Sequence, residues 1–134
     1  MIELKKEVIK YAQKLNSTNL SPLRSGNVSV RVTKENVEGF LLTPSGKRYE
    51  DLVPEDIVFL SLKEEYDNLK LFNSSLNPSS EWRFHQDIYR KKIEAKAIVH
   101  AHSPHATAVS VHGKSIPAFH YMVALAGGDD IKCA

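Results

Sequence analysis

The stretch from residue 78 to residue 105, PSSEWRFHQDIYRKKIEAKAIVHAHSPH, restricts the possible fold most, because it joins a helical pattern to an apolar strand. Ser79 or Ser80 can cap the N-terminus of the helix. Four residues then recur at helical spacing on one apolar-leaning side: Trp82, His85, Ile88 and Tyr89. The run KAIVHAH predicts a buried strand, and Pro104 ends it because proline cannot donate to a central ladder.

A histidine pair, His100 and His102, occupies alternate positions at the end of this strand. Strand side chains two residues apart share one face, so both imidazoles can reach one ion. The spacing is typical of a metal site; the alternative is a buried, hydrogen-bonded pair. The four remaining histidines are better interpreted as helix-surface or satisfied core residues: His85, His105, His112 and His120.

The rest of the chain predicts a helix and several short strands. Residues 3–15 carry apolar side chains at helical spacing, and the valines of 26–32 alternate with polar residues as in a half-buried strand. A turn at 34–36 indicates a hairpin with a strand at 39–43, and 57–62 is a third apolar strand. Residues 69–72 could form another strand. The segment 103–113 predicts a short helix with Ser103 as cap and Gly113 past its end, and 115–119 predicts a short strand or turn.

Composition narrows the class of protein. The 134 residues include 18 basic and 16 acidic side chains in mixed order, so a nucleic acid is not the expected partner. No apolar run approaches the roughly 18–20 residues of a membrane span, and the single Cys133 has no intrachain partner. We therefore expect a cytoplasmic protein that does not enter a membrane, with one domain over residues 1–134.

Three places could bind an anion. Gly26-Asn27 and Ser45-Gly46 combine a glycine with a polar side chain, although each is more often a plain turn. Ser79 and Ser80 precede a helix, whose first N–H groups attract anions. Glu81 beside them would also favour the helix dipole, and these interpretations do not exclude each other.

Taken together, five motifs resemble those of the class II aldolase and adducin family, and their order is most similar to its L-fuculose-phosphate aldolase branch. The motifs are GNVSVR (26–31), LLTPSG (41–46), SSEWRFH (79–85), IVHAHSPHATAVS (98–110) and IPAFHYMVALAGG (116–128). The resemblance implies a three-layer α/β/α sandwich with a largely antiparallel central sheet, incomplete at the C-terminus. It also implies a homotetramer with active sites at the subunit interfaces.

The resemblance assigns roles by position. Five residues would bind the substrate phosphate: Asn27, Ser45, Gly46, Ser79 and Ser80. His100, His102 and Glu81 would ligate one zinc ion per subunit, and Glu81 would also move protons. Tyr121 would be a proton donor. The family's third histidine ligand lies farther along than this chain extends, so we expect the 134 residues to be part of a longer protein.

The implied reaction is the zinc-dependent cleavage of a ketose 1-phosphate, similar to fuculose 1-phosphate, into dihydroxyacetone phosphate and an aldehyde. A metal-stabilised enediolate would be the intermediate. Two alternatives remain. One is a sugar-phosphate epimerase or dehydratase of the same family, and the other is a non-catalytic interaction domain like that of adducin.

Overall fold

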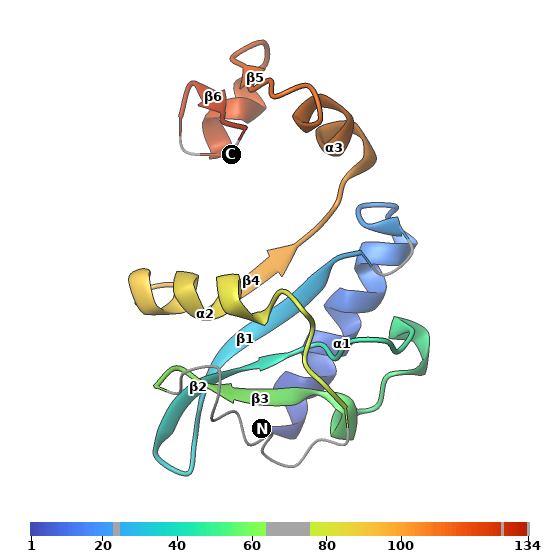
Figure 1. The fold of residues 1–134 in the computed structure, drawn as a ribbon, viewed down its shortest axis with the longest axis vertical. Helices are drawn as coiled ribbons and strands as arrows, with labels where there is room; N and C mark the ends of the chain where they lie inside the picture. The colour runs from blue at the N-terminus through green and yellow to red at the C-terminus, as the bar shows by residue number, and fades with distance from the viewer. Residues whose placement is uncertain (23–24, 64–75, 127, 134) are drawn as a thin grey trace. The chain divides into compact units, whose positions relative to one another are not determined.

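The computed structural model describes residues 1–22, 25–63, 76–126 and 128–133 (Figure 1). The chain divides into two compact units, Met1–Ala101 and His102–Ala134. The single domain expected over residues 1–134 stays a prediction. The possible strand at 69–72 lies outside the described residues.

The first unit is built on a four-stranded sheet in which every pairing is antiparallel. The strands are β1 (Asn27–Lys34), β2 (Val37–Leu42), β3 (Val58–Ser61) and β4 (Ala97–His100), in the order β3-β2-β1-β4. The predicted hairpin joins β1 to β2, with Val32 opposite Gly39. Glu35 and Asn36 form its turn with positive φ angles of 49° and 65°, as two-residue hairpin turns with the strands' own twist require.

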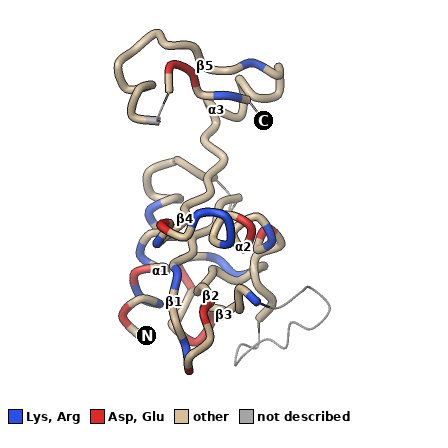
Figure 2. The backbone as a smooth tube through the Cα atoms, turned by 90° about the vertical axis from the view of Figure 1, so that its left-hand side faces the viewer, with Lys and Arg blue, Asp and Glu red and all other residues tan. Residues whose placement is uncertain are grey.

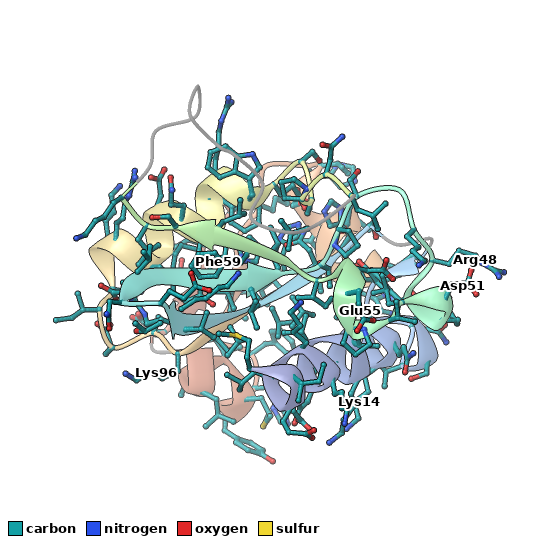
Figure 3. The ribbon with its side chains drawn as sticks, turned by 90° about the horizontal axis from the view of Figure 1, so that it is seen from below. Lys14, Arg48, Asp51, Glu55, Phe59 and Lys96 are labelled. Carbon is teal, nitrogen blue, oxygen red and sulfur yellow. The ribbon has the colours of Figure 1, made fainter. Side chains whose placement is uncertain are left out.

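Helices cover both faces of this sheet, as Figure 3 shows for α1 (Ile2–Ser17) and α2 (Trp82–Lys91). Side chains alternate between the two faces along each strand. Leu41 and Phe59 pack with Val8 and Ala12 of α1, whereas the neighbouring strand positions point to Trp82 and Tyr89 of α2. The antiparallel α/β/α arrangement implied by the family resemblance is therefore confirmed in this unit.

Two details of the predicted elements are wrong. The second helix begins at Trp82 with Glu81 in the N-cap position, so neither serine is its cap, although the Ser79 hydroxyl accepts the Glu81 N–H at 3.4 Å. β4 is not buried: it is an edge strand among the described residues, and Val99 is 56% exposed. An apolar run predicts burial, but here no described element covers that side of the strand.

The second unit contains short elements. They are α3 (Pro104–Ser110), β5 (Ile116–Pro117), the 3-10 helix η5 (Tyr121–Ala126) and β6 (Asp130–Ile131), with β5 and β6 paired antiparallel. The predicted start of α3 is confirmed, since Ser103 is the N-cap and Pro104 follows. The helix ends earlier than predicted, at Ser110 with Val111 as C-cap, and Gly113, with a φ of 62°, lies three residues past its end. The predicted short strand near residue 116 is also confirmed.

Charges of both signs are interspersed on the surface. Figure 2 shows basic and acidic residues following each other along α1, where Lys6 and Lys10 pair with Glu3 and Glu7. In the part of the chain that the structure describes, no helix has the length and apolar character needed to cross a bilayer.

Candidate metal centre and anion site

Glu81 and His100 face each other in the first unit. Glu81 precedes α2, and His100 is the last residue of β4, where Asn27 at the start of β1 is its partner in the sheet. Glu81 Oε1 lies 3.4 Å from His100 Nε2, and the two side chains are 34% and 29% exposed. The pair is thus half-buried and accessible to a small ligand, although the two positions are 19 apart in the sequence.

The separation of these two atoms fits a shared metal ion better than a direct bond. A charge-assisted N–H···O bond is usually about 2.7–2.9 Å long. In a tetrahedral zinc site with bonds of about 2.0–2.2 Å, two ligand atoms lie about 3.4 Å apart. One carboxylate oxygen and one imidazole nitrogen at 3.4 Å match that spacing, and both are ordinary zinc donors.

His102 supplies a third candidate ligand through the chain itself. Only Ala101 separates it from His100, and Glu81, His100 and His102 each offer one ligand atom to a possible metal site. The sequence predicts that His100 and His102 share one face of a strand. This prediction holds only in part, because β4 ends at His100 and His102 lies beyond the strand. Covalent proximity, not a shared strand face, is what associates the two rings.

Asn27 holds the carboxylate from the other side. Its amide Nδ2 donates to Glu81 Oε2 at 2.5 Å, and its Oδ1 accepts a bond from His85 Nε2. Asn27 is 2% exposed, so both polar atoms of its side chain are committed inside the protein. A phosphate contact by Asn27 would therefore have to use its backbone; the predicted phosphate role stays a prediction.

Gly26 lets β1 begin close to β4. A Cβ atom at this position would lie 2.5 Å from the carbonyl oxygen of His100 and 2.7 Å from Ser21 Oγ, which is shorter than side-chain contacts allow. The Tyr49 hydroxyl also donates to the Gly26 carbonyl oxygen. The sequence predicts Gly26 to be part of an anion-binding loop. In the structure a glycine is required at this position because the neighbouring atoms leave no room for a side chain.

Behind Asn27 lies a buried polar cluster that sequence reasoning missed. His85 is fully buried, and its Nδ1 lies 2.7 Å from Ser29 Oγ, which in turn lies 2.8 Å from the Tyr89 hydroxyl. Burial, with a smaller contribution from nearby His100, lowers the pKa of His85 to about 4. Burial likewise raises the pKa of Tyr89. The signal in the sequence is the spacing of His85 and Tyr89, four residues apart on one side of α2. That spacing indicates only that both side chains face the core, not that they bond to each other's neighbours in β1.

Two of the three predicted anion sites, Ser45-Gly46 and Ser79-Ser80, lie side by side in the first unit. The Ser79 N–H donates to the Thr43 carbonyl oxygen at 3.1 Å, and the Ser45 N–H donates to Asn77 at 2.9 Å. Pro44 and Pro78 form a bridge between the same segments. Ser45-Gly46 and Ser79-Ser80, 33 residues apart in sequence, are therefore brought together next to the start of α2, while their binding of phosphate stays a prediction.

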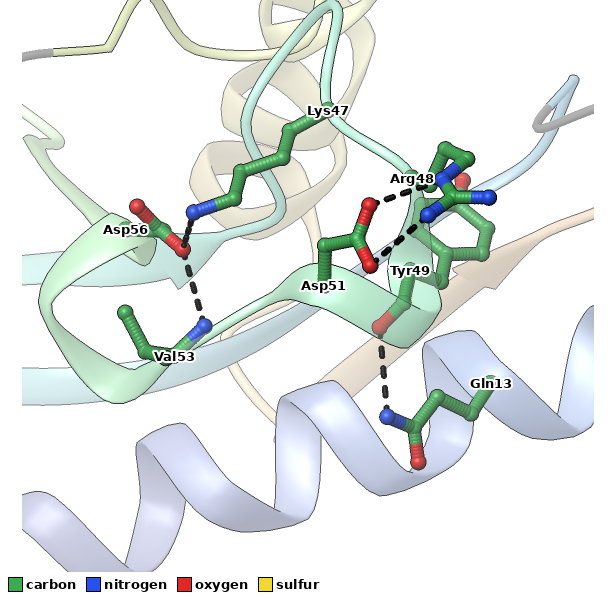
Figure 4. Close-up of polar contacts among 7 residues, drawn as sticks. All are labelled: Gln13, Lys47, Arg48, Tyr49, Asp51, Val53 and Asp56. Atoms are coloured by element: carbon green, nitrogen blue, oxygen red, sulfur yellow. Dashed lines mark hydrogen bonds and ion pairs between the residues drawn. The ribbon is translucent and has the colours of Figure 1, made fainter.

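Residues 47–56, which follow the Ser45-Gly46 turn, are held by polar contacts within the segment and by one contact from α1 (Figure 4). Lys47 Nζ contacts Asp56 Oδ2 at 2.6 Å, and that carboxylate also accepts the Val53 N–H at 2.8 Å. Gln13 of α1 donates to the Tyr49 carbonyl oxygen at 3.2 Å. These contacts span the 3-10 helices η2 (Tyr49–Asp51) and η3 (Pro54–Asp56) and fix the chain that leaves the Ser45-Gly46 turn.

Tyr121 lies in the second unit, at the first residue of η5. It is 76% exposed, and its ring centroid is 4.3 Å from that of His120. An exposed hydroxyl is available to a partner molecule, and the predicted role as proton donor stays a prediction.

Comparison with known proteins agrees with the sequence motifs. Residues 6–134 match the family described as Class II Aldolase and Adducin N-terminal domain. The chain is 42% identical to a 5-methylthioribulose-1-phosphate/5-deoxyribulose-1-phosphate aldolase of Rhodospirillum rubrum, over 98% of this chain and 55% of that protein. It is also 42% identical to the L-fuculose phosphate aldolase of Escherichia coli, over 98% of this chain and 57% of that protein.

The fold of this chain is also similar to those of solved aldolase structures. An L-fuculose 1-phosphate aldolase matches with a TM-score of 0.85 and 33% identity, over 98% of this chain and 58% of that one. A second structure, of the L-fuculose-1-phosphate aldolase from Thermus thermophilus, matches with a TM-score of 0.72 and 26% identity, over 93% and 59%. The chain thus spans a little over half the length of the relatives that it matches.

Proposed function

Because this chain belongs to the class II aldolase and adducin family, we propose that the protein carrying it is an aldehyde-lyase that cleaves a ketose 1-phosphate. The products would be dihydroxyacetone phosphate and an aldehyde. The observation that carries the proposal is the carboxylate–imidazole pair, Glu81 and His100, at the spacing of two metal ligands beside two adjoining loops with anion-binding chemistry. Relatives named as aldolases of fuculose phosphate and of methylthioribulose 1-phosphate support this substrate class.

Glu81, His100 and His102 are the residues that would hold a divalent ion, for which we propose zinc, one per subunit. When bound, such an ion supplies Lewis-acid polarisation of the ketose carbonyl and the adjacent hydroxyl. The donor set of carboxylate and imidazole suits zinc. The fit of the Glu81–His100 spacing to a zinc site is the structural support for this assignment.

The protein's own groups would perform the remaining steps. Glu81 Oε1 faces the candidate ligand position and would deliver a proton to the carbon that keeps the electron pair of the broken carbon–carbon bond, while Oε2 stays bonded to Asn27. During cleavage Tyr121 would accept the proton of the hydroxyl that becomes the aldehyde oxygen, and in the reverse condensation it would donate that proton back. The phosphate would lie against the Ser45-Gly46 and Ser79-Ser80 loops and Asn27, so binding energy far from the breaking bond orients the reacting carbons.

We further propose a homotetramer in the cytoplasm as the working form. A tyrosine that is 76% exposed and assigned to catalysis suits a site completed by a neighbouring subunit. Size-exclusion chromatography with light scattering on the full-length protein measures the subunit number.

The test replaces Glu81 by Gln in the full-length protein and measures cleavage of fuculose 1-phosphate, rhamnulose 1-phosphate and 5-methylthioribulose 1-phosphate. Loss of the proton-transferring group should lower kcat by about 10²–10⁴-fold while the melting temperature stays near that of the wild type. Glu94→Gln, which neutralises an exposed carboxylate just beyond α2, is the matched control and should keep full activity.

Two outcomes would contradict the proposal. Full activity of Glu81→Gln would remove this carboxylate from the mechanism. If the wild-type protein, assayed also with ribulose 5-phosphate, epimerises that sugar phosphate and leaves all three ketose 1-phosphates intact, the epimerase alternative is established instead.

A further inference from the structure

The buried cluster behind Glu81 consists of four side chains: Asn27, Ser29, His85 and Tyr89. Their exposed fractions are 2%, 1%, 0% and 0%. They come from β1 and α2, and they form a continuous series of hydrogen bonds that ends on the Glu81 carboxylate. Buried polar groups are costly unless every donor and acceptor is paired, so the direction of each bond can be worked out from one end.

The direction starts at Glu81. An ionised carboxylate only accepts hydrogen bonds, so the group 2.5 Å from Oε2 must be the NH2 of Asn27. The Asn27 carbonyl oxygen then faces His85 Nε2, and because that oxygen only accepts, Nε2 must carry the proton. One bond to the carboxylate thereby fixes both the orientation of the amide and the tautomer of the imidazole.

The remaining bonds follow in the same direction. The low pKa of His85, about 4, keeps the ring neutral at pH 7, so Nδ1 has no proton and accepts from the Ser29 hydroxyl. The Ser29 hydrogen is thus used, and the Tyr89 O–H donates to Ser29 Oγ at 2.8 Å. Every bond points toward Glu81, in the order Tyr89, Ser29, His85, Asn27, Glu81.

We propose that His85 is a positioning residue that acts through Asn27 on the catalytic carboxylate. With its Nε2–H, it holds the Asn27 amide in the one orientation that presents NH2 to Glu81. A rotated amide would place a carbonyl oxygen against the carboxylate, and Glu81 Oε1 would lose its place opposite His100 Nε2. This inference rests on the proposed function for the role of Glu81, whereas the bond directions stand without it.

Three variants of the full-length protein test the proposal. His85→Leu removes both ring nitrogens, His85→Gln restores an N–H near Nε2, and Gln86→Leu is the control. Gln86 is the next residue of α2, is 4% exposed, and donates to the Ser61 carbonyl oxygen of β3, at the opposite edge of the sheet from β4. The control therefore loses a comparable buried bond without cutting the series that ends on Glu81.

We expect His85→Leu to lower kcat and the zinc affinity about 10–100-fold, with KM changed much less, as loss of a group supporting a metal ligand does. His85→Gln should recover most of both, and Gln86→Leu should lose thermal stability while keeping kcat and zinc affinity. Wild-type kcat and zinc affinity in His85→Leu, or an equal loss in Gln86→Leu, would overturn the proposal.

A measurement without metal or substrate checks the bond directions. In ¹⁵N NMR spectra of the metal-free chain at pH 7, His85 should be neutral with its proton on Nε2. A proton on Nδ1, or a charged ring, would overturn the proposal. If the wild-type protein cleaves no sugar phosphate, the proposed function fails, and the His85 proposal is then judged by this tautomer and by zinc affinity measured through chelator competition.

Discussion

His85 is a titratable side chain with no exposed surface, and this ties stability to pH in a definite direction. Burial, with a smaller effect of His100, lowers its pKa from 6.5 to about 4. Between these two pH values His85 binds a proton in the unfolded chain but stays neutral in the folded chain. The stabilisation from a neutral His85 is therefore complete above pH 6.5 and is lost progressively as the pH falls to about 4.

We accordingly expect the free energy of unfolding of the metal-free chain to fall by about 3 kcal/mol from this residue alone between pH 7 and pH 4. Urea unfolding at several pH values, with a chelator present, measures it. His85→Gln cannot titrate and should show a shallower dependence on pH. Equal slopes for the two proteins would mean that His85 takes up its proton without unfolding.

At the scale of elements, strand periodicity predicts β1, β2 and β3 but misjudges what lies on the second face of β1. Ser29 and Arg31 alternate with valines, which is typical of a strand with one solvent-exposed face. In the structure α2 covers that face, and Ser29 is 1% exposed. The pattern misleads because these polar groups are satisfied by partners 56 and 58 residues away, His85 and Tyr89, which a local sequence pattern cannot register.

Arg31 shows how the polar face holds α2 on the sheet. Its guanidinium donates to the carbonyl oxygens of Tyr89 at 2.5 Å and Lys92 at 3.2 Å, at the C-terminal end of the helix. It also donates to the Ala95 carbonyl oxygen at 2.9 Å and pairs with Glu38 at 2.5 Å. Carbonyls at a helix C-terminus lack partners within the helix and attract positive charge, so one planar group satisfies several acceptors.

Arg31→Lys should therefore lower the free energy of unfolding by about 1–3 kcal/mol, because one ammonium cannot span acceptors that a five-donor fork reaches. Arg48→Lys is the control: Arg48 also bonds a carboxylate twice, through Asp51 at 2.7 and 3.0 Å, but its side chain is 68% exposed. It should change stability little. Chemical denaturation measures both, and an equal loss would show that burial of Arg31 is unimportant.

At the scale of the whole molecule, the candidate site could be only partly predicted from residue patterns. The spacing of His100 and His102 suggested a metal, but Glu81 entered through the family resemblance, since a glutamate before a helix more simply complements the helix dipole. Asn27, Glu81 and His100 meet because β1 pairs with β4 and α2 crosses the same sheet. Contacts between residues so far apart in the sequence depend on the topology of the fold, which local sequence patterns do not encode.

The two compact units should differ in their ability to fold alone. Met1–Ala101 contains both clusters of buried apolar residues, on the two faces of its sheet. Among the described side chains of His102–Ala134, Val123 is the buried hydrophobic one, and large apolar side chains such as Phe119 and Leu125 are 75% and 74% exposed. Ordering a residue's backbone costs about 1–2 kcal/mol, which so little burial cannot offset.

We therefore expect a polypeptide of residues 1–101 to unfold cooperatively, with a far-ultraviolet circular dichroism spectrum of mixed helix and strand. A peptide of residues 102–134 should have the spectrum of an unfolded chain, because α3 spans seven residues and isolated helices shorter than about 12–15 residues are marginal in water. Thermal melts of the two polypeptides provide the measurement. A cooperative transition in the 102–134 peptide would show that local contacts alone order it, and loss of cooperativity in 1–101 would show that the clusters around α1 and α2 need the rest of the chain.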